Sequence, residues 1–171
     1  MKINIFYTCP VVAIIIACVI LSGCIGPKEQ NTRPVFTKTA DVDEALSSFD
    51  GFLASTPLSW DVNNSFCESG TCRQQLIAVN GDQVVVTLRL YQSGAEATNA
   101  YTAMKKGLGK YSLSDVQIAD TGYGWHSGTQ SESGFISGQT IGVVDYLRAQ
   151  GNATGQESTG LATFLADTLI K

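Results

Sequence analysis

A two-residue turn signal between two apolar segments constrains the fold more than any other feature of this chain. Asn80-Gly81 is among the strongest short-range signals for a β-hairpin. It separates residues 73–79 from residues 83–91, and both segments are rich in strand-forming residues. The second segment alternates, so that one face would carry Val84, Val86, Leu88 and Leu90. The sequence therefore predicts an antiparallel hairpin near the centre of the chain.

Three segments carry apolar residues at helical spacing. Residues 41–54 begin with Asp41 and end before Pro57, and a second helix opens at Ser93, three residues before Glu96, in a capping-box pattern. The third helix is C-terminal, and Ser158 or Thr159 is expected near its N-cap. Its apolar stripe consists of Leu161, Phe164, Leu165 and Leu169.

Short apolar segments between the second and third helices predict further strands. They cover residues 113–120, 123–127, 135–136 and 140–148, and a loop rich in Gly, Ser and Glu precedes residue 135. The order of helix, hairpin, helix, meander and helix indicates an α+β domain, with a mainly antiparallel sheet packed by about three helices. This order is similar to that of small two-layer domains of the PsbP-like type. The resemblance concerns the pattern of elements alone and implies no activity.

The N-terminus carries an export signal. After Lys2, the apolar segment from Val11 to Leu21 matches the length of a signal-peptide core, which is about 7–15 residues, whereas a spanning helix needs about 20. Leu21-Ser22-Gly23-Cys24 then resembles the lipobox of prokaryotic membrane-anchored lipoproteins. The resemblance implies that residues 1–23 are a cleaved signal peptide and that Cys24 carries a lipid.

The lipobox also implies a cellular location for the protein. A diacylglyceryl cysteine supplies two acyl chains of the palmitate type, and two chains anchor a protein stably where one does not. Cys24 would therefore bind membrane lipid and hold the protein on the extracytoplasmic side of the cell membrane. Residues 24–40 are polar and contain Pro27 and Pro34, which predicts a flexible tether before a single globular domain of residues 41–171.

Cysteine usage agrees with export. Of the five cysteines, Cys9 and Cys18 lie in the signal and Cys24 in the lipobox, which leaves Cys67 and Cys72 for the domain. An even pair in an oxidising compartment predicts a disulfide. A zinc site is disfavoured because structural zinc needs four ligands and the chain holds a single histidine. We therefore expect neither a metal nor a cofactor.

Charge and motif content narrow the possible functions. Lys and Arg number 11 against 15 Asp and Glu, with no basic cluster, so nucleic acid is not an expected partner. His126 and Ser127 are adjacent in a predicted strand and would point to opposite faces, so they cannot act together as base and nucleophile. Gly124 to Gly128 has His126 where a hydrolase elbow has its serine. The sequence does not predict an enzyme.

The candidate binding surface is Tyr123, Trp125 and His126 with the glycine-rich loop that follows, and Trp60 could join it. Aromatic side chains with polar tips beside loops often make contact surfaces. The alternative is that Trp125 belongs to the core, with Tyr123 on the same face and His126 facing solvent.

The expected function is accordingly a membrane-anchored binding or interaction module for an unknown ligand. A structural or envelope-assembly lipoprotein is the alternative, and a hydrolase is a more distant one. Asn63 and Asn152 stand in sequons and are possible glycosylation sites, provided that the source cell glycosylates such positions.

Overall fold

One seven-stranded antiparallel sheet organises the domain, in the order β1-β2-β3-β7-β6-β5-β4. The computed structural model describes residues 39–169, with side chains from residue 45 onward. These residues all belong to one compact unit. The predicted signal peptide, Cys24 and all but the last two residues of the predicted tether lie outside the described residues. The strands are β1 Trp60–Glu68, β2 Thr71–Ala78, β3 Gln83–Leu90, β4 Ser114–Val116, β5 Thr121–Ser127, β6 Gln130–Ser137 and β7 Thr140–Leu147.

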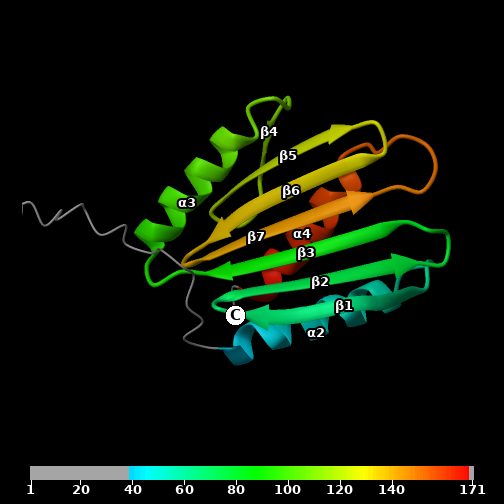
Figure 1. The fold of residues 1–171 in the computed structure, drawn as a ribbon, viewed down its shortest axis with the longest axis horizontal. Helices are drawn as coiled ribbons and strands as arrows, with labels where there is room; N and C mark the ends of the chain where they lie inside the picture. The colour runs from blue at the N-terminus through cyan, green and yellow to red at the C-terminus, as the bar shows by residue number, and fades with distance from the viewer. Residues whose placement is uncertain (1–38, 170–171) are drawn as a thin grey trace, which may run out of the picture. The chain divides into compact units, whose positions relative to one another are not determined.

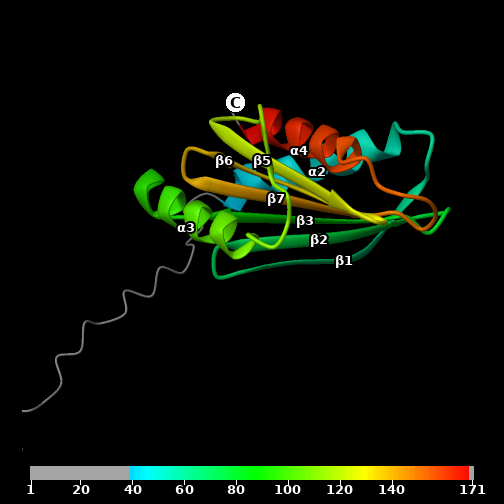
Figure 2. The same cartoon turned by 90° about the horizontal axis from the view of Figure 1, so that it is seen from above.

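The helices divide between the two faces of the sheet. Within the described residues they are α2 Thr39–Ala54, α3 Gly94–Gly107 and α4 Gln156–Leu169. Figure 2 shows α2 and α4 side by side on one face and α3 on the other. The chain forms β1, β2 and β3, crosses through α3, and returns as a second meander that places β7 beside β3 (Figure 1). The predicted α+β class and mainly antiparallel sheet are confirmed.

Alternation along the strands produces two separate apolar cores. On one face, alternate strand residues pack against α2 and α4. This core includes Phe49, Leu76, Val86, Phe135, Val144 and Leu165. On the opposite face, α3 covers a smaller aromatic core that includes Tyr91, Tyr101, Tyr123, Trp125 and Ile141. Because neighbouring residues of a strand point to opposite faces, β6 and β7 each contribute to both cores, whereas β5 contributes only to the core beneath α3.

Both hairpins of the first meander have turns of recognisable chemistry. Asn80-Gly81 joins β2 to β3 as predicted, with Gly81 at a φ of 88°. Ser69 and Gly70 both take positive φ, as a two-residue type I′ turn requires, and they join β1 to β2. The predicted disulfide between Cys67 and Cys72 closes this turn, with a Cα–Cα distance of 4.1 Å between directly paired residues.

Several predicted boundaries differ from the structure. Strand β1 was not predicted, and its residues are almost all exposed, so it lacks the alternation that marks a half-buried strand. Strand β6 was expected only at residues 135–136 but begins at Gln130, because buried serines fill its first half in place of apolar residues. The predicted strand at residues 113–120 shrinks to β4, and Ala119 takes a φ of 48° that strand backbone does not allow.

No helix among residues 39–169 combines the length and apolar composition that crossing a membrane requires.

Candidate functional site

Of the four aromatic and imidazole residues singled out from sequence, only Trp125 and His126 line a common pocket, and they do so from opposite faces of β5. Tyr123 and Trp125 lie on the α3 face of β5 and are only 0% and 5% exposed, while His126 is exposed. Trp125 stacks on Tyr111 with ring centroids 3.9 Å apart. Tyr123 and Trp125 therefore belong to the core, as the alternative interpretation had it, and they do not form an exposed surface with His126.

Trp60 lies at the other edge of the sheet. It begins β1, packs edge-on against Tyr146 and donates its indole N–H to Thr56 Oγ1 over 3.2 Å. Strands β1 and β5 are separated by four strands, so Trp60 does not join His126 in one site. Of the predicted sequon residues, Asn63 and Asn152 are both exposed, on β1 and on the loop before α4.

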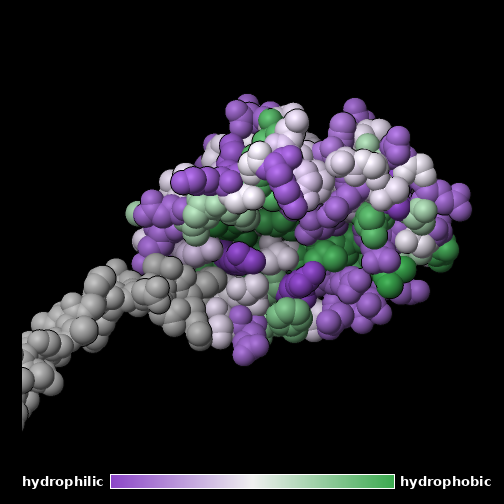
Figure 3. Space-filling model, turned by 45° about the horizontal axis from the view of Figure 1, so that its top comes forward, coloured by the Kyte–Doolittle hydropathy of each residue, from purple (hydrophilic) through white to green (hydrophobic). Residues whose placement is uncertain are grey.

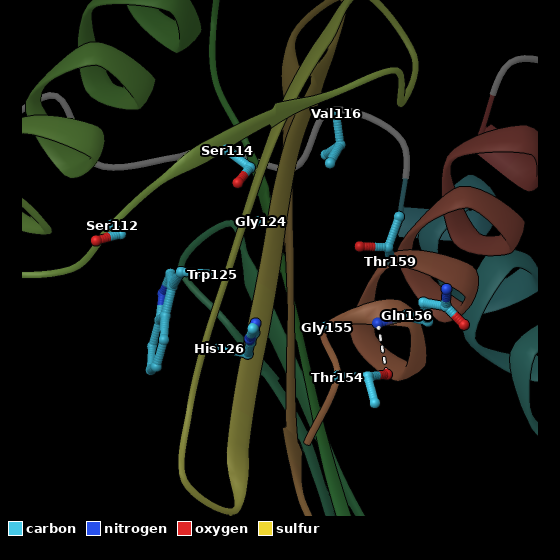
Figure 4. A pocket seen from close by; sticks show the side chains of 10 residues that line it. All are labelled: Ser112, Ser114, Val116, Gly124, Trp125, His126, Thr154, Gly155, Gln156 and Thr159. Atoms are coloured by element: carbon cyan, nitrogen blue, oxygen red, sulfur yellow. Dashed lines mark hydrogen bonds between the residues drawn. The ribbon is translucent and has the colours of Figure 1, made fainter. Parts of the chain in front are cut away.

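His126 lies instead in a pocket of about 540 Å³ between β4, β5 and the N-terminal end of α4. We call it the β5–α4 pocket, and Figure 4 labels the ten residues that line it. Hydroxyl groups predominate among its polar side chains, and the hydroxyl-bearing residues are Ser112, Ser114, Thr154 and Thr159. Trp125 and Gly124 complete the strand side. The pocket thus collects residues from three separate parts of the chain.

A capping box builds the α4 side of the pocket. Thr154 donates to the Glu157 carboxylate from its backbone N–H over 3.1 Å and from its hydroxyl over 2.8 Å. Its hydroxyl also accepts from the Gln156 backbone N–H over 3.3 Å. The predicted cap at Ser158 or Thr159 is therefore wrong, and the signal that could have located the cap is the T-x-x-E pattern of Thr154 to Glu157.

On the strand side, a small residue of β5 leaves room for a serine hydroxyl of the neighbouring strand β6. Ser133 Oγ lies 3.0 Å from both Ser158 Oγ and Thr159 Oγ1. Gly124 pairs with Ser133, and a methyl group at Gly124 would lie 3.3 Å from Ser133 Oγ. Beside them, Ser131 pairs with His126, and its fully buried hydroxyl has no hydrogen-bond partner within the described part of the chain.

Glu157 follows the lining residue Gln156, and its carboxylate contacts its own helix end and Arg148. Burial acts to raise the pKa of Glu157, but hydrogen bonds from its backbone and from Thr154, together with the Arg148 charge, hold that pKa below its usual value. Arg148 Nη1 lies 3.2 Å from Glu157 Oε1. The two charges therefore neutralise each other beside the pocket.

A second polar cluster, which the sequence did not reveal, lies on the opposite face. Glu132 of β6 pairs with Asp145 of β7, and the Tyr123 hydroxyl donates to Glu132 Oε1 over 2.5 Å. Burial and then the neighbouring Glu132 carboxylate raise the pKa of Asp145 to about 7, while the Arg73 charge opposes that shift. We call Glu132 and Asp145 the acid pair.

The acid pair lies on the face of the sheet that α3 covers only in part. Figure 3 shows apolar side chains gathered in the middle of this surface beside polar ones. Gly134 makes room for the tyrosine of the cluster, because a methyl group there would lie 2.4 Å from the Tyr123 ring. Among the residues of known position, no group of three or more His, Cys, Asp or Glu side chains could hold a metal ion.

Comparisons of this chain with protein families, with curated proteins and with solved structures find no match.

Proposed function

We propose that this protein is an exported lipoprotein, anchored through a lipid on Cys24 after removal of its signal peptide, whose domain holds a small ligand in the β5–α4 pocket. The observation that carries the binding role is the convergence of polar groups from three parts of the chain on one pocket of about 540 Å³. Pockets of about 300–1,000 Å³ with a few convergent polar groups are typical small-molecule sites.

Binding without catalysis is the role that this pocket supports. His126 is the only imidazole in its lining, and no hydrogen bond joins His126 to a hydroxyl within residues 39–169. A nucleophile needs such a contact to be activated. The hydroxyls of Ser133 and Thr159 contact each other instead, which suits recognition of a ligand.

A blocking substitution tests the binding role. Ser114 is exposed and lines the pocket, so Ser114→Trp should fill it without disturbing the core. Gln117→Trp is the matched control, because Gln117 is also exposed and does not line the pocket. A ligand at 100 times its Kd should stabilise the wild type and the control by about 2.7 kcal/mol, and the blocked variant by much less. A small-molecule library screened by thermal unfolding of the full-length protein in detergent makes the measurement. Equal stabilisation of all three proteins would contradict the proposal.

The anchor is tested by mass. Mature protein from membranes should begin at Cys24 and carry a lipid, while Cys24→Ala should leave the unlipidated precursor. Intact mass spectrometry distinguishes them, and a wild-type species that keeps Met1 without added lipid would refute the anchor.

A role in envelope assembly is the second candidate, and the surface of β1 favours it. Val62 and Phe66 are 50% and 46% exposed on this strand, which lies at the edge of the sheet. Exposed edge strands can pair with other chains. If assembly is the function, Phe66→Ser should abolish cross-linking to a stable envelope partner, while Ser114→Trp should leave that cross-linking intact.

A further inference from the structure

We infer that the β5–α4 pocket recognises an uncharged ligand rich in hydroxyl groups, such as a sugar ring. This inference rests on the binding role proposed above and names the ligand class of the same pocket. Four features carry it: the charge of the lining, the state of the α4 N-terminus, the arrangement of the hydroxyl groups, and an unpartnered serine beside the pocket.

The lining offers no counter-charge. None of the described residues that line the pocket is Lys, Arg, Asp or Glu. Beside the lining residues of α4, the charges of Arg148 and Glu157 are 3.2 Å apart and bind each other. A charged ligand would lose its hydration without gaining an ionic partner, which is costly in a partly closed site. A neutral ligand does not meet this penalty.

The N-terminus of α4 is already occupied by a carboxylate. A free helix N-terminus attracts anions through its unpaired N–H groups and its dipole. Here the Glu157 carboxylate accepts from the Thr154 backbone N–H over 3.1 Å, and the Gln156 N–H donates to Thr154 Oγ1 over 3.3 Å. An incoming phosphate or carboxylate would face the charge of Glu157 and would find these donors engaged.

The hydroxyl groups match a ligand that both donates and accepts. Thr159 directs its hydroxyl toward the strands, opposite Gly124 (Figure 4), and that hydroxyl lies 3.0 Å from Ser133 Oγ. Each hydroxyl can donate once and accept twice, so ligand hydroxyls can join this network either as donors or as acceptors.

An unpartnered serine beside the pocket points the same way. The Ser131 hydroxyl, fully buried and paired in register with His126, has no partner in the described structure. A buried hydroxyl without a partner is unfavourable, and because Ser131 does not itself line the pocket, a ligand hydroxyl could satisfy it through a bridging water.

The test uses the only histidine of the chain as a reporter. Imidazole NMR signals of the full-length, untagged protein would be followed in a detergent without a sugar headgroup, at constant pH. The probes are neutral methyl glycosides and disaccharides in one arm, and inorganic phosphate and acetate in the other. We expect at least one neutral sugar to shift the His126 signals saturably, and phosphate and acetate to leave them unchanged.

A pair of isosteric variants localises the contact. Thr159→Val removes a hydroxyl that lines the pocket, and Thr163→Val makes the same change one turn further along α4, outside the lining. The first should weaken sugar binding by about 3–10-fold, as expected for the loss of one hydrogen bond, and the second should leave it unchanged.

The outcomes separate the ligand class from the binding role. Saturable shifts with phosphate or acetate and none with sugars would overturn the ligand class and leave the binding role standing. Suppose that neither set of probes shifts the His126 signals, but a library compound stabilises the wild type and not Ser114→Trp. The sugar inference would then be refuted, and the binding role would stand. If no probe and no library compound acts, both proposals fall. Equal sugar affinity in the two threonine variants would also overturn the inference.

Discussion

The two faces of β6 carry opposite kinds of polar chemistry within three consecutive residues. Ser131 and Ser133 point toward the side of α4, where Ser133 contacts two other hydroxyls. Glu132, between them, points to the α3 side, where it accepts from the Tyr123 hydroxyl and lies against Asp145. One side therefore carries neutral hydroxyl groups, and the other can gain or lose a proton near neutral pH.

The difference shows how a strand can serve two purposes at once. Because side chains alternate, a polar residue on one face places no constraint on the chemistry of the other. The hydroxyl side is suited to recognition through neutral hydrogen bonds. The acid side stores repulsion between two carboxyl groups, which makes the stability of the fold depend on pH.

The largest expected effect compares neighbouring residues on the two sides of β5. Trp125→Ala should lower the free energy of unfolding by about 3–5 kcal/mol, because Trp125 is 5% exposed and stacks on Tyr111. His126→Ala should change it by less than about 0.5 kcal/mol, because His126 is exposed. Denaturant unfolding of the two variants beside the wild type makes the measurement. Similar losses in both would remove the distinction between the two sides.

The second prediction concerns the acid pair. The pKa of Asp145 is raised to about 7 in the folded protein, mainly by burial and then by Glu132, from an ordinary value of 3.8. Between these values the folded state binds more protons than the unfolded state, so stability falls as pH rises from about 4 to 7. Asp145→Asn removes this penalty and should stabilise the protein by a few kcal/mol at pH 8, and by little at pH 4.

The control for this prediction is Asp115→Asn. Asp115 is 90% exposed at its side chain and lies 3.0 Å from Lys105, so its loss should leave the shape of the pH profile intact. Thermal unfolding at several values of pH compares the variants. A wild-type profile that does not fall between pH 4 and 7 would show that the acid pair carries no raised pKa.

The sequence predicted the fold better than it predicted the site, and the reason is physical. Apolar alternation marks β3, and the Asn80-Gly81 turn places its partner β2, so the α+β class followed from local patterns. Strand β1 lacks such a pattern because both of its faces are exposed, and pairing with β2 through the Cys67–Cys72 turn holds it in the sheet.

The site depends on contacts that no local pattern reveals. Glu132 lies in a segment of glycines and serines, and only the register of β6 against β7 brings it to Asp145. The β5–α4 pocket joins residues 112–126 to residues 154–159, which are distant in the chain. The sequence indicated His126 as a residue that could face solvent, and it is exposed. The residues across the pocket from it come from the start of α4, which the sequence placed too late in the chain.

The smallest expected effect tests why the pocket side stays neutral. Glu157→Gln keeps groups that can accept from Thr154, because glutamine also serves in a capping box, but it removes the negative charge from the α4 N-terminus. Stability should fall by only about 0.3–1 kcal/mol, since a carboxylate near a helix N-terminus contributes about that much. The helix end and Arg148, which lies 3.2 Å from Glu157, would then attract an anion. Inorganic phosphate should therefore begin to shift the His126 signals in this variant at concentrations that leave the wild type unchanged. Glu96→Gln is the matched control, because Glu96 occupies the first turn of α3, away from the pocket. If phosphate affects the Glu157 and Glu96 variants alike, the charge of Glu157 is not what keeps anions from the pocket.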